Sequence, residues 1–283
     1  MKKFHLDTAE VYIPDNVPLE QALSRTTHLC LAAHQDDIEI MAAQPIIECF
    51  QQKDKWFTGV VVTDGRGSPR DSLYRDYTDD EMRLVRFKEQ RKAAIVGEFA
   101  AQIMLDIPSK VIKDASHDEP VDNILAILRV TTPQVVYTHN LADKHDTHVG
   151  VALRVIQALR RLDQAERPER VVGCEVWRAL DWMVDSDKVM MDLSSHENLQ
   201  MALLGVFDSQ IVGGKRYDLA SLGRRRANAT YFEAHGVDET TGLSYGMDMT
   251  PLMNDTNLEP AEFVGQFIQR FATDVQERVN RIS

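Results

Sequence analysis

The sequence predicts a Rossmann-like α/β fold, in which helices flank a mostly parallel β-sheet. Short apolar runs alternate with stretches of helical periodicity over the first two thirds of the chain, as in parallel strands joined by crossover helices. Clusters of polar residues follow some of these runs directly. The chain has 283 residues, of which 43% are hydrophobic and 27% charged, which is enough for a sizeable core.

Six apolar runs have the length and composition of buried strands. In chain order they span residues 28–33, 57–63, 101–106, 134–139, 171–177 and 188–193. Between and after them, apolar residues recur at helical spacing. We expect helices at about 38–53, 79–101, 119–130, 145–162, 195–207, 215–233 and 260–280, with Pro45 kinking or delaying the first.

The last third of the chain is expected to be helical, apart from a glycine-containing stretch over 236–258. That stretch is interpreted either as a lid over a site or as a disordered or oligomer-contacting loop. No shift in composition marks an interdomain linker. We therefore expect one domain over 1–283, with a core at about 25–195 and a helical extension at about 196–283.

Composition argues against several functional classes. The formal net charge is −12, and the one arginine run, Arg224–Arg226, is short and expected on a solvated helix face, so nucleic acid and anionic membranes are disfavoured as partners. No segment reaches the roughly 20 apolar residues of a membrane span, and no signal peptide is evident. The three cysteines predict neither disulfides nor a thiolate metal site. We expect a cytoplasmic protein, and a homo-oligomer stays open.

A histidine and two carboxylates stand directly after the first predicted strand, as His34, Asp36 and Asp37. Such groups are costly to bury without partners. A divalent metal would satisfy them, because zinc binds both imidazole nitrogen and carboxylate oxygen. The alternative, in which one aspartate merely caps the next helix, is equally consistent with this segment alone.

A second polar cluster follows the fourth predicted strand. Residues 139–148 contain His139, His145 and His148 together with two aspartates. His145 and His148 are three positions apart, so they project from one side of a helix that begins there. The carboxyl ends of parallel strands meet at one rim of a sheet, where ligands bind. The two clusters together predict a shared metal site at that rim.

The stretch AAHQDDIEI resembles the AHPDDE-type signature of the LmbE-like (PIG-L) family of zinc-dependent N-acetylglucosaminyl deacetylases. THNLADKHDTHVG resembles the downstream H-x-x-H element of that family, and VVVTDGRGS and RFKEQRKAAIVG are similar to segments between the two. The match runs in order from about residue 28 to 165. It implies a hydrolase that removes an acetyl group from a small-molecule N-acetylglucosamine-type substrate. The implied cofactor is Zn²⁺, with Fe²⁺ or another divalent metal as the alternative.

The resemblance also implies a role for each matching residue. His34, Asp37 and His148 would bind the metal, Asp36 would be the general base, and His145 would stabilise the oxyanion or protonate the leaving amine. These residue types suit the chemistry, because zinc lowers the pKa of water to about 7 and a base must lie within reach of that water. Asp143 would orient a histidine or simply form a turn.

Several other positions allow more than one structural or functional interpretation. Arg86 would lie near the substrate, or form a surface ion pair on its helix. Gln35, Ile38 and Thr147 depart from the family pattern and bear on the shape of the turn and the pocket. Trp177 is interpreted as core or rim packing, with a sugar-binding wall as the alternative. An amidase for another amide, such as a thiol conjugate, and a non-catalytic metal- or sugar-binding relative stay open as functions.

Overall fold

A computed structural model describes residues 4–283, and within this range it forms one mixed sheet of eight strands. The strands are β1 (Glu10–Tyr12), β2 (His28–Ala32), β3 (Phe57–Thr63), β4 (Ala101–Ile107), β5 (Val135–His139), β6 (Arg170–Cys174), β7 (Lys188–Asp192) and β8 (Leu243–Asp248). Their order across the sheet is β1-β4-β3-β2-β5-β6-β8-β7. The five central strands, β4 to β6, are mutually parallel, as the alternation of strands and helices predicts.

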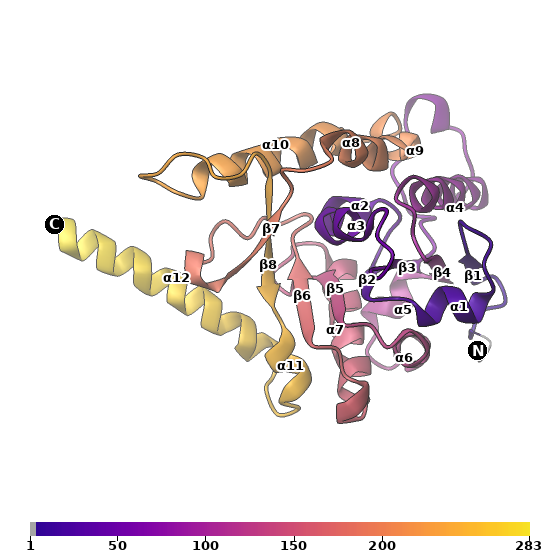
Figure 1. Cartoon of the computed structure of the whole chain (residues 1–283), viewed down its shortest axis with the longest axis horizontal. Helices are drawn as coiled ribbons and strands as arrows, with labels where there is room; N and C mark the ends of the chain where they lie inside the picture. The colour runs from indigo at the N-terminus through magenta and orange to yellow at the C-terminus, as the bar shows by residue number, and fades with distance from the viewer. Residues whose placement is uncertain (1–3) are drawn as a thin grey trace.

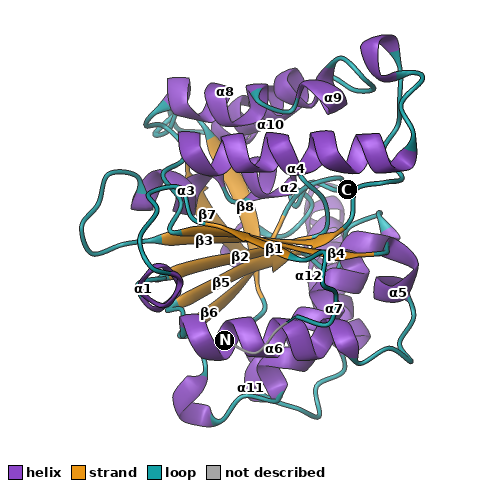
Figure 2. Ribbon diagram, turned by 90° about the vertical axis from the view of Figure 1, so that its right-hand side faces the viewer, coloured by secondary structure: helices purple, strands orange, loops and turns teal. Residues whose placement is uncertain are grey.

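Helices cover both faces of this sheet (Figures 1 and 2). On one face lie α2 (Asp37–Met41), α3 (Ala43–Cys49), α4 (Asp79–Val96), α8 (Glu197–Gly205), α9 (Asp208–Ile211) and α10 (Tyr217–Tyr231). On the other lie α1 (Leu19–Ser24), α5 (Ser109–Lys113), α6 (Glu119–Thr131), α7 (Asp146–Arg160), α11 (Thr250–Asn254) and α12 (Pro260–Ile282). Each face has its own buried apolar cluster. The described helices include none that is both long and apolar enough to span a bilayer.

Local sequence explains where several elements begin and end. All residues of β2 and β3 are buried, which matches their unbroken apolar runs. Helix α4 begins at a capping box between Thr78 and Glu81 and ends at Gly97. The helix expected over 38–53 is split at Ala42, and the second segment begins so that Pro45 lies in its first turn, where the missing N–H costs nothing.

The stretch 236–258 differs from the expected loop. It contains β8, which forms antiparallel pairs with β6 and β7 in the interior of the sheet order, and α11, which packs against α7. The lid and loop interpretations are therefore wrong for residues 243–254. The sequence LSYGMD gives a weak strand signal, and pairing with two neighbouring strands supplies the stabilisation that local propensity does not.

The arginine run also differs from the expected solvated face. Arg225 is buried and donates hydrogen bonds to the carbonyl oxygens of Glu39 and Ile40 and to Gln200, so it fastens α10 to α2 and α8. Arg226 is exposed and pairs with Glu197. Adjacent residues on a helix point in different directions, and a run of three charges necessarily samples more than one face.

Candidate metal centre and pocket

The first part of the site is the turn that joins β2 to α2. Oδ2 of Asp37 accepts a hydrogen bond of 2.8 Å from the backbone N–H of His34 and lies 3.2 Å from Nδ1 of the same histidine. Asp36 precedes the helix, but its side chain makes no capping hydrogen bond. Capping therefore does not explain Asp36. Its backbone has φ of 96°, a strained conformation that the surrounding structure must hold in place.

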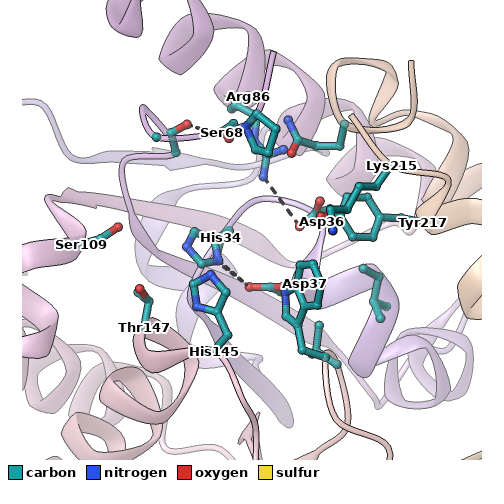
Figure 3. Close-up of a pocket in the computed structure, with 17 residues that line it drawn as sticks. His34, Asp36, Asp37, Ser68, Arg86, Ser109, His145, Thr147, Lys215 and Tyr217 are labelled. Carbon is teal, nitrogen blue, oxygen red and sulfur yellow. Dashed lines mark hydrogen bonds and ion pairs between the residues drawn. The ribbon is translucent and has the colours of Figure 1, made fainter. Parts of the chain in front are cut away.

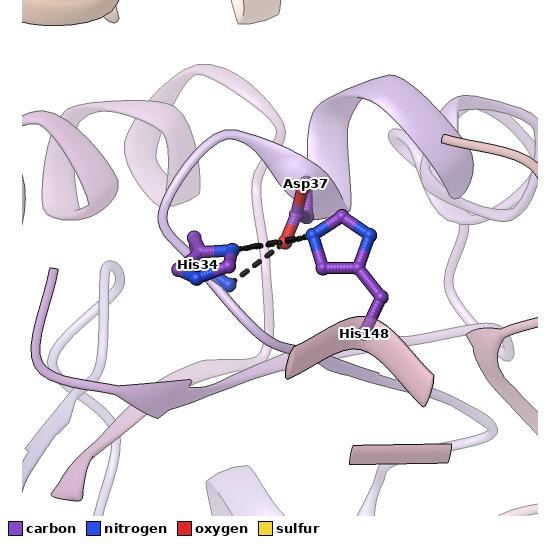
Figure 4. Close-up of side chains that lie close together, drawn as sticks. All are labelled: His34, Asp37 and His148. Atoms are coloured by element: carbon purple, nitrogen blue, oxygen red, sulfur yellow. Dashed lines mark hydrogen bonds and ion pairs between the residues drawn. The ribbon is translucent and has the colours of Figure 1, made fainter. Parts of the chain in front are cut away.

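The second part is His148, in the first turn of α7. Its Nε2 lies 3.3 Å from Oδ2 of Asp37 and 3.2 Å from Nδ1 of His34 (Figure 4). One ligand atom from each of His34, Asp37 and His148 lies within 4.8 Å of the other two. Segments more than a hundred residues apart thus meet at the rim where the sequence predicts that they meet. Two imidazole nitrogens and one carboxylate oxygen are a donor set that fits Zn²⁺ or a similar divalent ion.

The charges around His148 also favour a cation there. Burial lowers the pKa of His148, but Asp37 and Asp143 outweigh burial and raise that pKa to about 9. Burial likewise raises the pKa of Asp37, and His148 followed by His34 outweighs it, so the pKa of Asp37 lies well below its usual range. A positive charge is therefore favoured between these side chains, whether a proton or a metal ion supplies it.

A further layer of residues holds His148 in position. Oδ2 of Asp143 lies 3.5 Å from Nδ1 of His148 and accepts a hydrogen bond from the backbone N–H of Trp177, while Oδ1 accepts one from the backbone N–H of His145. Asp143 thus orients a histidine and also forms the turn. His139 stacks on His148 with ring centroids 3.9 Å apart. Because Nε2 of His139 accepts a 2.8 Å hydrogen bond from the N–H of Ala33, that nitrogen is occupied and is not available to a metal.

Arg86 is buried and does not form the surface ion pair that was the alternative expectation for it. It is 1% exposed, donates hydrogen bonds to the carbonyl oxygen and the side chain of Gln35, and lies 3.6 Å from Oδ1 of Asp36 (Figure 3). Its Nη1 is buried and has no hydrogen-bond partner among residues 4–283. Arg86 therefore fixes the strained turn and the carboxylate of Asp36, and it leaves one nitrogen free to bind another group.

Gln35, which replaces the family's usual proline, tightens this turn. Its side chain reaches the carbonyl oxygen of Thr63 and receives the hydrogen bond from Arg86. The turn after β3 passes so close that a Cβ at Gly65 would lie 2.4 Å from Oε1 of Gln35, and Gly65 has φ of +70°. Only glycine fits here. The departure at residue 35 is thus accommodated by contacts from two other segments.

A cavity of about 510 Å³ opens in front of these groups. His34, Asp36, Asp37, Arg86 and His145 all line it, while His148 is buried behind them. Burial raises the pKa of Asp36 to about 7, with Arg86 opposing the rise and Asp37 adding to it. Burial also lowers the pKa of His145, and the neighbouring His148 lowers it further. The six residues that the sequence singles out therefore surround one opening.

The cavity has further lining residues, most of which have no assigned role in the sequence. They are Ser68 and Pro69 of the turn after β3, Trp177 after β6, and Gln210, Lys215 and Tyr217 around α9 and α10. The last three belong to the helical third of the chain, and only their position in the folded structure shows that they lie next to the metal centre. Trp177 lines the cavity, so its interpretation as plain core packing is incomplete. Its ring centroid lies 6.2 Å from that of His145.

Comparison with solved structures relates this fold to proteins of several activities. The conserved protein TT1542 from Thermus thermophilus is 17% identical, with a TM-score of 0.61 over 78% of this chain and 94% of its own. The hydratase GalB from Pseudomonas putida KT2440, which acts on 4-carboxy-2-hydroxymuconate, is 14% identical, with a TM-score of 0.58 over 79% and 95%. The N,N′-diacetylchitobiose deacetylase from Pyrococcus horikoshii is 16% identical, with a TM-score of 0.58 over 78% and 83%. At these identities the likeness shows a common fold.

Sequence comparison identifies the family. No curated protein sequence matches the chain significantly. The family described as GlcNAc-PI de-N-acetylase, PIG-L, matches residues 29–159. This segment contains His34, Asp36, Asp37, Arg86, His145 and His148, so the resemblance expected from the motifs is confirmed. The segment that matches the PIG-L family includes the whole predicted metal centre.

Proposed function

We propose that this protein is a metal-dependent N-deacetylase that hydrolyses the acetyl amide of an N-acetylglucosamine-type small molecule. The observation that carries the proposal is the convergence of His34, Asp37 and His148 beside Asp36 and His145 in one cavity of a PIG-L domain. The deacetylase among the similar structures acts on an acetylated sugar, which supports this substrate class.

His34, Asp37 and His148 would hold the metal ion. When bound, Zn²⁺, or Fe²⁺ or Co²⁺ in its place, supplies a Lewis acid that polarises the amide carbonyl and makes water a stronger acid. The side chain of His34 is 22% exposed, whereas those of Asp37 and His148 are almost fully buried. The ion would therefore be open to substrate on the side of His34, as a catalytic rather than a structural site requires.

Asp36 and His145 would carry the proton and charge chemistry. Asp36 takes a proton from the attacking water, and the water oxygen bonds to the carbonyl carbon. Asp36 then returns the proton to the nitrogen as the C–N bond breaks, which gives acetic acid, ionised to acetate, and a free amine. A carboxyl held near Arg86 with a pKa of about 7 is a suitable base at neutral pH. Because burial lowers the pKa of His145, its neutral imidazole favours N–H donation to the oxyanion over donation of a full proton.

Arg86 would bind the substrate through its free Nη1 while its other nitrogens hold the turn. An amidase acting on another amide would use the same groups. The hydratase among the similar structures shows that this fold also serves a different reaction. Release of acetate and a primary amine in equal amounts distinguishes deacetylation from both.

The test combines metal analysis with an assay of free amine on a panel of N-acetylated sugars. We expect about one divalent ion per chain, and its loss in His34→Ala and in His148→Ala. Asp36→Ala should keep the ion but lower kcat by about 10²- to 10⁴-fold. Asp146→Ala, which changes an exposed aspartate in the same segment, is the matched control and should keep both properties.

Two results would contradict the proposal. A full metal content in both histidine variants would remove the ligand assignment. Unchanged turnover in Asp36→Ala would remove the general base, because no other carboxylate among the residues that line the cavity is free of the metal group.

A further inference from the structure

A second cavity of about 250 Å³ continues from the catalytic cavity. Five residues line both of them: Ile40, Val176, Trp177, Lys215 and Tyr217. The two cavities therefore adjoin each other, and we name the second one the side groove.

The wall that the side groove shares with the catalytic cavity is largely apolar and includes two aromatic rings. The rings of Trp177 and Tyr217 meet edge to face with centroids 6.1 Å apart, and Ile40 and Val176 add aliphatic surface. Trp177 also lies beside His145, so one face of the wall begins at the catalytic residues. A surface of this kind favours a ring or another apolar group over a fully hydrated sugar.

Two cations of the groove, Lys215 and Arg224, form no ion pair with an acidic residue among residues 4–283. Nζ of Lys215 lies 4.6 Å from the centre of the Trp177 ring, and within residues 4–283 it forms no ion pair. The two arginines of the groove are engaged elsewhere: Arg216 forms two hydrogen bonds with Asp218, and Arg224 donates to the carbonyl oxygen of Val176. The ammonium of Lys215 has no hydrogen bond or ion pair among residues 4–283, so in a chain with net charge −12 it is the groove cation most free to attract an anion.

We infer that the side groove binds the part of the substrate beyond the acetylated sugar, and that this part is an apolar or aromatic group bearing a carboxylate or a phosphate. The apolar portion stacks on Trp177 and the anion pairs with Lys215. This inference rests on the proposed function, since it assumes that the acetyl amide lies at the metal centre. It adds a substrate class that the metal residues alone do not specify.

The test uses three N-acetylglucosaminides that differ only in the aglycone: phenyl, 4-carboxyphenyl and 4-(aminomethyl)phenyl. The methyl glycoside is the reference. We expect kcat/KM to be highest for the carboxylate and lowest for the amine, with about a threefold to fivefold preference for 4-carboxyphenyl over phenyl, as for a partly exposed ion pair. This preference should fall as salt is added.

Lys215→Gln should lower the ratio of kcat/KM for 4-carboxyphenyl over phenyl to about one. Lys144→Gln is the matched control, because Lys144 also lies near the Trp177 ring, at 5.9 Å, but lines neither cavity. It should keep the preference. Trp177→Ala should raise KM for all three aryl glycosides relative to the methyl glycoside. Equal loss in both lysine variants, or no preference in the unmodified protein, would overturn the inference.

The inference about the side groove can still be tested if the proposed deacetylase activity is absent. If no N-acetylated glycoside is hydrolysed, the inference is tested by calorimetric binding of 4-carboxyphenyl glucosaminide, the product. Binding that Lys215→Gln weakens about threefold or more, and Lys144→Gln does not, supports the groove independently of catalysis. Absence of binding, or equal weakening in both variants, overturns it.

Discussion

Two buried carboxylates of this protein, Asp37 and Glu175, have opposite surroundings. Each follows a strand of the central sheet, and each is 3% exposed or less. Glu175 accepts hydrogen bonds from the N–H of Leu180, the amide of Asn228, and the hydroxyl of Ser244 and N–H of Tyr245. Asp37 accepts one backbone N–H and otherwise faces the ring nitrogens of His34 and His148.

This difference distinguishes a structural carboxylate from one prepared for a metal. Protein donors surround Glu175, so the polar group is satisfied and its region is closed. The ring nitrogens around Asp37 can carry either a proton or a metal ion, and a positive charge between them and the carboxylate stabilises the group. The pKa directions agree. Burial raises the pKa of Glu175 despite its donors, whereas the histidines hold the pKa of Asp37 well below its usual range.

The largest expected difference is in activity. Asp37→Asn keeps the shape of the side chain and removes its charge, so we expect loss of the metal and a fall in deacetylation of about 10³-fold or more. Glu175→Gln should keep its metal and stay within about threefold of normal kcat at a temperature where it is folded, since Glu175 lines neither cavity. Metal analysis and the amine assay check both. A similar loss in the two variants would remove the distinction.

The next difference concerns thermal stability with added metal. A ligand that binds only the folded state at 100 times its Kd adds about 2.7 kcal/mol to the free energy of unfolding. We expect Zn²⁺ to raise the Tm of the unmodified protein and of Glu175→Gln by similar amounts, and to leave Asp37→Asn unchanged. Differential scanning calorimetry after chelation and readdition of metal measures this. A Tm rise in Asp37→Asn equal to the normal one would show that the ion binds elsewhere.

A smaller effect is expected without metal. Glu175→Gln places an amide N–H₂ against groups that are themselves donors, which should lower the free energy of unfolding by about 1 to 3 kcal/mol. Urea unfolding of the chelated protein gives this value. The exposed Glu197→Gln serves as a control and should change stability by less than about 0.5 kcal/mol. Equal effects of the two substitutions would show that the donors around Glu175 contribute nothing.

The smallest expected effect is the pH dependence of the difference in unfolding free energy between the unmodified protein and Glu175→Gln. Because the pKa of Glu175 is raised in the folded state above its ordinary 4.5, the unfolded chain loses this proton first as pH rises. Ionisation of Glu175 therefore lowers stability with increasing pH above about 4.5, up to the raised folded-state pKa. The difference in unfolding free energy between the unmodified protein and Glu175→Gln should therefore be larger at pH 5 than at pH 8. A gap that widens with pH would contradict this sign.

Local patterns were sufficient to predict the parallel strands and the meeting of His34 with His148. Unbroken apolar runs mark buried strands, and the rule that their carboxyl ends share one rim brings the two polar clusters together. The roles of the six site residues stay predictions. The hydrogen bonds of Arg86 to Gln35 could not be predicted, because they depend on how close α4 lies to the β2–α2 turn.

The contribution of the C-terminal third to the sheet and to the cavity could not be predicted from the sequence either. Strand β8 is stabilised by partners on both sides, and Lys215 and Tyr217 reach the cavity only through the packing of α10 over α2 and α8. Neither feature has a periodic or compositional signature. Tertiary contacts between distant segments decide them, and these are what a single sequence specifies least directly.

The insertion of β8 between β6 and β7 has a consequence for biosynthesis. As the polypeptide leaves the ribosome, β2, β3, β4 and β5 are available to pair well before residue 243 has been made. In the segment after β6, which carries Trp177, Glu175 receives two of its hydrogen bonds from Ser244 and Tyr245, so these two contacts form only after residue 243 has been made. The metal centre would thus be assembled on the nascent chain before the wall of the side groove.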